Sequence, residues 1–138
     1  MRGMDSGEVC MILAGYENKM REFMDANAGL YRRVAKQFTF VDYSAAELAQ
    51  IAQLQIDAMR FTSDATHGAL TKVMASAPAE MRSLMNGGVA DTLVKLGKEH
   101  LDSRLPANCD AASLCHFTLA DFKAGMERMK KQWAERKA

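Results

Sequence analysis

The sequence predicts a mainly α-helical protein, with a helical body from Ser44 onward and two short strands before it. Only two prolines occur among 138 residues. Alanine and leucine, which lose little conformational freedom in a helix, are abundant. Beyond Ser44 the apolar residues recur at spacings of three and four, as on one face of a helix. Before Ser44, two short segments have the pattern of strands.

The first predicted strand is the apolar run Val9–Ala14, which ends at Gly15. A helix over roughly Glu17–Ala26 follows, and the alternating segment Phe38–Val41 is the second predicted strand. The backbone donors and acceptors of a strand need a partner ladder. We therefore expect both strands to pair with sequence upstream of Met1.

The helical body begins with a predicted capping box, in which Ser44 and Glu47 each satisfy one backbone amide of the first turn. The triplet Thr62-Ser63-Asp64 is predicted to cap the next helix. A short helix is predicted over Ala79–Met85, after the break at Pro78.

The second half of the body contains two longer predicted helices. Asn86-Gly87-Gly88 is predicted to open a helix that ends near Arg104, and Pro106–His116 is predicted to be a loop. Thr118 and Asp121 are predicted to begin the final helix. That helix carries an apolar stripe at helical spacing: Phe122, Met126, Met129 and Trp133.

Composition excludes several classes of protein. The formal net charge of +1 excludes a broad polycationic nucleic-acid binder and leaves open a local basic patch, so nucleic acid is not the expected partner. The apolar run Val9–Ala14 is too short to span a bilayer, and the N-terminus lacks the apolar core of a signal peptide. Three cysteines are an odd number, too few for a disulfide scaffold. We therefore expect a protein that is not secreted.

The cysteines also pose the question of a metal site. Cys109, Cys115 and His116 share one segment, and His100 lies in the preceding predicted helix. The two cysteines are farther apart than the tight pairs of structural zinc sites, and no second pair follows them. We favour ordinary loop thiols and expect no metal.

Three segments, taken in order, resemble the C-terminal part of an AAA+ ATPase of the CbxX/CfqX group. They are Ile12-Leu13-Ala14-Gly15-Tyr16, then Asn27-Ala28-Gly29-Leu30-Tyr31-Arg32-Arg33-Val34, then Phe38-Thr39-Phe40-Val41-Asp42-Tyr43-Ser44 with Glu47-Leu48. The ordered set is more specific than any one segment. The resemblance covers about Val9 to Arg104 and implies that residues 1–43 end the large AAA+ subdomain, with residues 44–138 forming the helical lid.

The resemblance also implies two site residues. Tyr16 would occupy the sensor-1 position, although its ring could instead cap a buried strand. Arg33 would be the arginine finger that reaches the ATP of the neighbouring subunit, a task suited to a planar, permanently charged group. Without the resemblance, Arg32, Arg33 and Lys36 would be interpreted as a solvated basic cluster.

Two departures from the family pattern stand out. Asn27-Ala28 replaces the usual Asn-Pro, and Gly88 and Asp91 stand where arginines are frequent in activase-like members. We therefore assign no sensor-2 arginine, and the departure argues against a close Rubisco activase relative.

The function implied is that of a lid and finger in a homohexameric ATPase. The complete protein would use ATP and Mg²⁺ to remodel an unknown protein substrate, in the cytoplasm or an organelle stroma. This chain has no Gly-x-x-x-x-Gly-Lys-(Ser/Thr) and no apolar strand ending in Asp-Glu, so alone it is predicted to be inactive. The alternative is a stand-alone helical interaction module, derived from such a lid and without catalysis.

Overall fold

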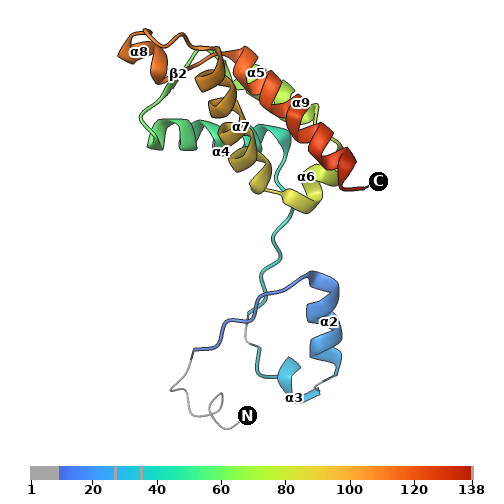
Figure 1. The fold of residues 1–138 in the computed structure, drawn as a ribbon. Helices are drawn as coiled ribbons and strands as arrows, with labels where there is room; N and C mark the ends of the chain where they lie inside the picture. Colours follow the sequence, from blue (N-terminus) through green and yellow to red (C-terminus); the bar gives the residue numbers. More distant parts are fainter. Residues whose placement is uncertain (1–9, 27, 35, 138) are drawn as a thin grey trace. The chain divides into compact units, whose positions relative to one another are not determined.

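The computed structural model describes residues 10–26, 28–34 and 36–137. The chain divides into two compact units, Met1–Val41 and Asp42–Ala138, hereafter unit 1 and unit 2. The described residues are mainly helical (Figure 1), which confirms the predicted fold class.

The described residues of unit 1 include the helices α2 (Glu17–Asp25) and α3 (Ala28–Tyr31), which contact each other. Tyr16 is the N-cap residue of α2. Lys19 pairs with Glu22 at 2.9 Å, one turn along the exposed face of α2. The helix predicted over Glu17–Ala26 is thus confirmed, and it ends one residue earlier than expected.

The two predicted strands are not observed. Cys10–Gly15 and Phe38–Val41 belong to no strand or helix, and Val9 lies outside the described residues. Ile12 is 88% exposed and Phe40 is 93% exposed. Their apolar patterns match strands, but a strand forms only against a partner ladder. The prediction of two strands in this part of the chain was therefore wrong for the described residues.

Unit 2 is a helical body (Figure 1). Its elements are α4 (Ala45–Ala58), β1 (Thr62–Ser63), α5 (His67–Ala75), α6 (Ala79–Met85), α7 (Gly88–Arg104), α8 (Ala111–Leu114), β2 (His116–Phe117) and α9 (Leu119–Glu135). The predicted capping box at Ser44 and Glu47 is present, and α6 has the predicted bounds. The final helix begins after Thr118, as predicted.

The two short strands of unit 2 correct two local predictions. Thr62 and Ser63 do not cap a helix, because they form β1, which pairs in parallel with β2; Thr62 lies opposite His116. The residue that caps α5 is Thr66, whose side chain accepts from the Ala69 amide at 3.3 Å. The predicted loop Pro106–His116 contains α8 and the first residue of β2. A two-residue ladder is too short to produce a periodic pattern in the sequence.

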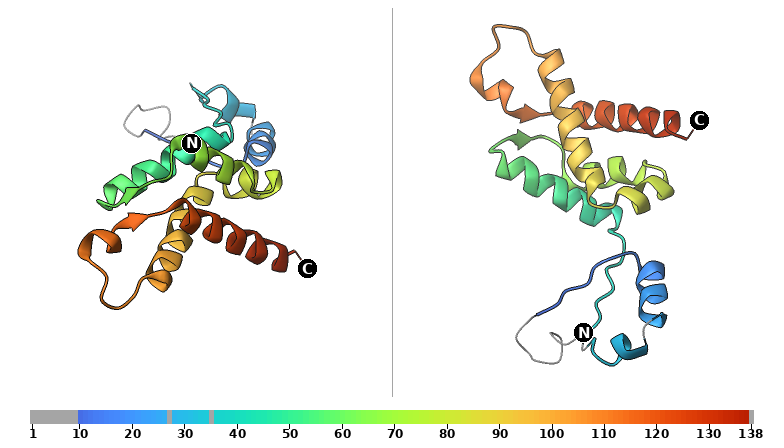
Figure 2. Two further views of the ribbon diagram at one scale, coloured as in Figure 1. Left: turned by 90° about the horizontal axis from the view of Figure 1, so that it is seen from above. Right: turned by 60° about the horizontal axis from the view of Figure 1, so that its bottom comes forward.

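Helices α7 and α9 cross in close contact (Figure 2). Two buried glycines permit this approach. A Cβ atom added to Gly125 would lie 3.0 Å from the backbone nitrogen of Gly97 and 3.3 Å from the carbonyl oxygen of Leu93. A larger residue at position 125 would therefore force the two helices apart.

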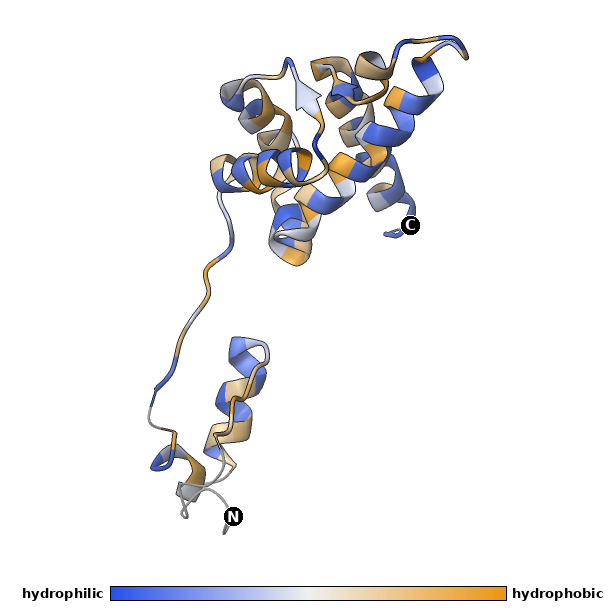
Figure 3. Cartoon of the chain, turned by 90° about the vertical axis from the view of Figure 1, so that its left-hand side faces the viewer, coloured by the Kyte–Doolittle hydropathy of each residue, from blue (hydrophilic) through white to orange (hydrophobic). Residues whose placement is uncertain are grey.

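The core of unit 2 is formed by the apolar faces of its helices. Hydrophobic and hydrophilic residues alternate along the helices (Figure 3). Phe61, Phe117 and Phe122 stack in series, with ring centroids 5.4 and 5.0 Å apart. The methionines Met81, Met126 and Met129 are buried with them, as core filler. Every buried side-chain polar atom of the described residues has a hydrogen-bond partner.

Candidate functional site

The structure brings together two segments of unit 2 that the sequence singled out separately. Asp42 and Tyr43, which precede α4, are bound to the turn between α6 and α7. Asn86 Oδ1 accepts from the Tyr43 amide at 3.0 Å, and Asn86 Nδ2 donates to Asp42 Oδ1 at 3.3 Å. Ser83 Oγ donates to the other oxygen of Asp42 at 2.6 Å. We name this cluster of Asp42, Tyr43, Ser83, Asn86 and Gly87 the lid-entry clamp.

The backbone at Asn86 is held in an unusual conformation. Its φ is 47° and its ψ is −124°, a region that favours glycine. Such strain costs on the order of 1–3 kcal/mol and persists only where the surroundings impose it. A glycine here would relieve the strain but could not make the two side-chain hydrogen bonds to Asp42 and Tyr43. Asn86 therefore binds Asp42 and Tyr43 through its side chain while its own backbone remains strained.

Neighbouring contacts hold both sides of the clamp. Glu47 accepts from the Ser44 amide at 2.8 Å, and hydrogen bonds from the Ser44 backbone and side chain keep the pKa of Glu47 below its usual value. Gln55 on α4 donates to Asp91 in the first turn of α7. Asp91 is thus engaged in a contact between helices. Gly88 begins α7, and nothing lies within 4 Å of the Cβ position there.

The two site residues predicted from the family resemblance both lie in unit 1. Tyr16 is 80% exposed in the described part of unit 1. Arg33 follows α3, and its guanidinium donates to the carbonyl oxygen of Gly29 at 3.1 Å. The Arg33 amide also donates to the Leu30 carbonyl at 2.9 Å, which fixes the turn after the helix.

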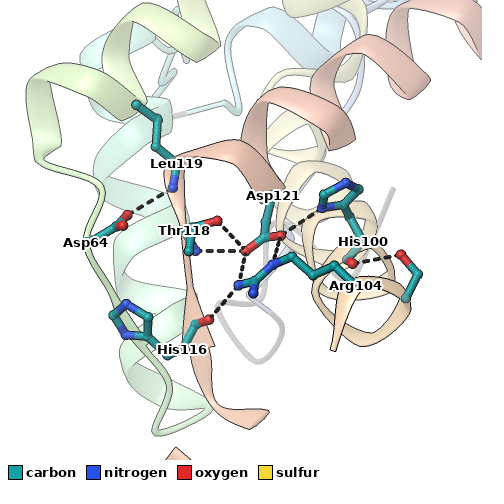
Figure 4. Close-up of polar contacts among 8 residues, drawn as sticks. Asp64, His100, Arg104, His116, Thr118, Leu119 and Asp121 are labelled. Atoms are coloured by element: carbon teal, nitrogen blue, oxygen red, sulfur yellow. Dashed lines mark hydrogen bonds and ion pairs between the residues drawn. The ribbon is translucent and has the colours of Figure 1, made fainter. Parts of the chain in front are cut away.

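A second polar cluster surrounds the buried carboxylate of Asp121 (Figure 4). Arg104 donates to both carboxylate oxygens, at 2.8 and 2.9 Å, and His100 Nδ1 lies 2.7 Å from Oδ1. The Thr118 amide donates to Oδ2 at 2.8 Å. Burial raises the pKa of Asp121, but the hydrogen bonds from Arg104, Thr118 and His100 outweigh burial and hold it well below the ordinary range.

This cluster joins α7 to the start of α9. The Arg104 guanidinium also reaches the carbonyl of His116 at 3.3 Å, at the end of the loop that precedes α9. Because both oxygens of Asp121 already accept hydrogen bonds, the carboxylate has a structural role rather than that of a proton acceptor. Sequence analysis explained Asp121 only as a helix cap. The visible signal for its second role was the spacing of His100 and Arg104, which places both on one face of α7.

The cysteines and histidines form no metal site in the part of the chain that is described. Among those residues, no group of three or more metal-binding side chains is present. Cys115 accepts through its backbone carbonyl from the Thr62 amide at 2.8 Å, and His116 Nδ1 lies 2.8 Å from Thr62 Oγ1. His116 therefore belongs to the β1–β2 ladder, and Cys115, the residue before β2, is hydrogen-bonded to β1. Within the described ranges, no helix is both long and apolar enough to cross a membrane.

Comparison with known proteins bears on unit 2 first. A family model described as "Domain of unknown function (DUF8495)" matches residues 42–130. The chain belongs to this family. The DUF8495 match begins at Asp42, the residue at which unit 2 begins. It therefore includes the whole lid-entry clamp and the Asp121 cluster.

Relatives of this DUF8495 protein include members of the predicted group, which confirms the resemblance. Protein CbxX (chromosomal) of Cupriavidus necator is 40% identical over 57 residues, 41% of this chain and 18% of the relative. A CfxQ homolog of Pyropia yezoensis is 40% identical over 54 residues, 39% of this chain and 18% of the relative. The ESX-1 secretion system protein EccA1 of Mycolicibacterium smegmatis is 30% identical over 119 residues, 80% of this chain and 21% of the relative. The chain thus spans about one fifth of the length of these relatives.

Proposed function

We propose that the chain supplies the helical lid and a trans-acting arginine finger to an AAA+ ATPase that remodels a protein substrate. The observation that carries the proposal is the lid-entry clamp. The Asp42-Tyr43-Ser44 segment and the Asn86-Gly87-Gly88 segment begin 44 positions apart in the sequence. Tyr43 and Asn86 are nevertheless joined by a hydrogen bond of 3.0 Å. The relationship to CbxX and EccA1 gives independent support.

The proposed lid is unit 2. The lid-entry clamp is the place at which a movement of the preceding segment would be transmitted to it. Two side-chain hydrogen bonds of Asn86 and one of Ser83 bind the entry segment to the α6–α7 turn. A displacement of residues 42–43 would then be passed to α7 and, through the close α7–α9 crossing, to the rest of the body. The clamp is thus suited to move the lid as one unit.

The proposed finger is Arg33, and Tyr16 is proposed for the sensor-1 position. The guanidinium of Arg33 is held at the end of α3 by its hydrogen bond to Gly29. A guanidinium held in this way could neutralise charge that develops on the terminal phosphate of a nucleotide bound by a neighbouring subunit. Since a trans finger requires a neighbouring subunit, we propose a homo-oligomer, a hexamer by family resemblance, in the cytoplasm or an organelle stroma.

ATP and Mg²⁺ would be held by residues outside this chain. The sequence contains no phosphate-binding Gly-x-x-x-x-Gly-Lys-(Ser/Thr) segment. We therefore assign the chain no hydrolytic step of its own, and its proposed contribution to the reaction is the charge of Arg33.

The test compares Arg33→Ala with Arg32→Ala in the complete protein, in which ATP turnover and the binding of a fluorescent ATP analogue are measured. We expect Arg33→Ala to lower turnover by about 1000-fold or more with binding retained, as for other arginine fingers. The Arg32→Ala control should change turnover by less than about threefold, since its side chain is exposed next to the finger. In mixed rings, Arg33→Ala subunits should also inactivate wild-type neighbours. Turnover unchanged by Arg33→Ala would exclude the finger.

The alternative is an interaction module without catalysis, and the closed core of unit 2 favours it. Sequencing the transcript upstream of the Met1 codon distinguishes the two proposals. An in-frame phosphate-binding loop followed by a strand ending in Asp-Glu supports the ATPase. A stop codon directly before Met1 leaves the interaction module.

A further inference from the structure

A groove runs between α5 and α9 on unit 2, away from the lid-entry clamp. The two helices lie side by side (Figure 1), and the space between them is about 600 Å³. Asp64 Oδ1 accepts from the Leu119 amide at 2.9 Å, so the segment that precedes α5 is joined to the first residue of α9 (Figure 4). The groove extends from there to Ser76 on α5 and Lys130 on α9.

The walls of the groove follow the periodicity of the two helices. Leu119, Lys123, Glu127 and Lys130 lie on one face of α9, at spacings of four, four and three. On α5, Ala69, Lys72, Val73 and Ser76 line the opposite wall. Ala69 and Leu119 are half-buried apolar residues, whereas Val73 is 6% exposed and belongs to the core. Gly68 leaves open space where a side chain would project. Two such helical faces are the usual walls of a groove that receives a third helix.

The side chains that line this groove carry more positive than negative charge. Three lysines line it, against the single carboxylate of Glu127. Glu127 is already paired with Lys130 at 2.8 Å, whereas Lys72 and Lys123 are exposed. The whole chain is almost neutral, with 18 basic and 17 acidic residues. The groove therefore carries an excess of positive charge that the almost neutral chain as a whole does not have.

We propose that the α5–α9 groove binds an acidic amphipathic helix of a partner protein. Apolar side chains of that helix would lie on Ala69 and Leu119, and its carboxylates would face Lys72 and Lys123. The face of α9 from Leu119 to Lys130 is about 17 Å long at 1.5 Å per residue, so it matches about 11 helical residues. This proposal does not depend on the arginine finger, because every residue that it uses lies in unit 2.

The experiment uses the full 138-residue chain and a fluorescein-labelled peptide of about 15 residues. The peptide carries leucine at helical spacing on one face and glutamate on the other. Fluorescence anisotropy should show saturable binding, and amide shift changes in NMR spectra should be confined to α5 and α9. Two control peptides test the chemistry: one has lysine in place of glutamate, and the other has serine in place of leucine. Both controls should bind at least about tenfold more weakly.

Charge reversal on the protein gives the matched test. Lys72→Glu and Lys123→Glu should each weaken binding of the acidic peptide by about tenfold, and the double variant by more. Lys95→Glu makes the same change of net charge on α7, outside the groove, and should leave binding within about twofold. All three lysines are exposed, so the variants should keep the unfolding midpoint of the native chain.

Three results would overturn the proposal. The first is no saturable binding of the acidic peptide, and the second is equal binding of the two oppositely charged peptides. The third is a fluorescein-labelled poly(U) oligonucleotide that binds more tightly than the peptide and loses affinity in the same two variants, which would assign the lysines to nucleic acid. None of these results would alter the Arg33 experiment, so the two proposals fail separately.

Discussion

Units 1 and 2 have similar proportions of apolar residues, but these residues are buried to very different extents. In unit 2, twenty buried apolar side chains form a single core. Among the described residues of unit 1, Leu30 is the one apolar side chain that is buried, and Phe38, Phe40 and Val41 are 75%, 93% and 82% exposed. Amphipathic helices can bury their apolar faces against helices that are close in the sequence, whereas strands need a ladder. The comparison shows that an apolar pattern produces its structure only where the complementary surface is present.

The largest expected effect is that of Asp121→Ala, which tests whether unit 2 is held by its polar cluster as well as by its apolar core. We expect a loss of about 3 kcal/mol in the free energy of unfolding, near the lower end for breaking a buried ion pair. The loss stays at that end because Arg104 and His100 keep 32% and 39% of their side chains exposed and can regain water. Urea unfolding followed by the fluorescence of Trp133, the single tryptophan, measures unit 2 directly.

The matched control for this variant is Asp102→Ala. It removes an exposed carboxylate that pairs with Lys98 at 2.9 Å on the same helix as His100. An exposed pair of this kind contributes less than about 1 kcal/mol. Equal losses in the two variants would show that the burial of Asp121 has no energetic consequence.

The same carboxylate predicts how stability depends on pH. The pKa of Asp121 is lowered in the folded state, so its contribution is fully present above the unfolded-state pKa of about 3.9. It is lost as the pH falls below about 4, toward the lower pKa of the folded state. Replacing Asp121 with asparagine should therefore reduce the slope of unfolding free energy against pH in this range. An unchanged slope would mean that other carboxylates account for acid unfolding.

Much of unit 2 could be predicted because its signals are local. The boxes at Ser44 with Glu47 and at Thr118 with Asp121 involve residues three positions apart, and both helix starts were located from them. The β1–β2 ladder joins residues 54 positions apart and has only two residues in each strand, so it left no pattern. Only part of the lid-entry clamp could be predicted from the sequence. Asn86-Gly87-Gly88 indicated a turn, but the hydrogen bond from Tyr43 to Asn86 depends on tertiary packing.

The next largest effect is expected at the α7–α9 crossing. Gly125→Ala should destabilise unit 2 by about 1–3 kcal/mol, because the new methyl group would meet backbone atoms of α7 that cannot rotate away. Gly68→Ala is the control, since nothing lies within 4 Å of its Cβ position in α5. It should stabilise the chain by up to about 1 kcal/mol through the lower entropy of the unfolded state. A shift of the same sign in both variants would show that helix propensity, rather than close packing, governs these positions.

The smallest effect on stability is expected in unit 1. It tests directly whether the apolar residues of unit 1, unlike those of unit 2, contribute nothing to the stability of the fold. Replacing both Phe38 and Phe40 with serine should change the unfolding free energy reported by Trp133 by less than about 0.5 kcal/mol, because neither ring is buried. The same double variant should reduce light scattering and the binding of a hydrophobic dye, since exposed strand-like segments promote association through their unpaired edges. A loss above about 1 kcal/mol would show that the rings pack on a structured partner within the chain. Unchanged stability together with reduced association would instead show that the two rings make contacts between chains. In unit 2, by contrast, the apolar side chains of the helices make their contacts within one chain.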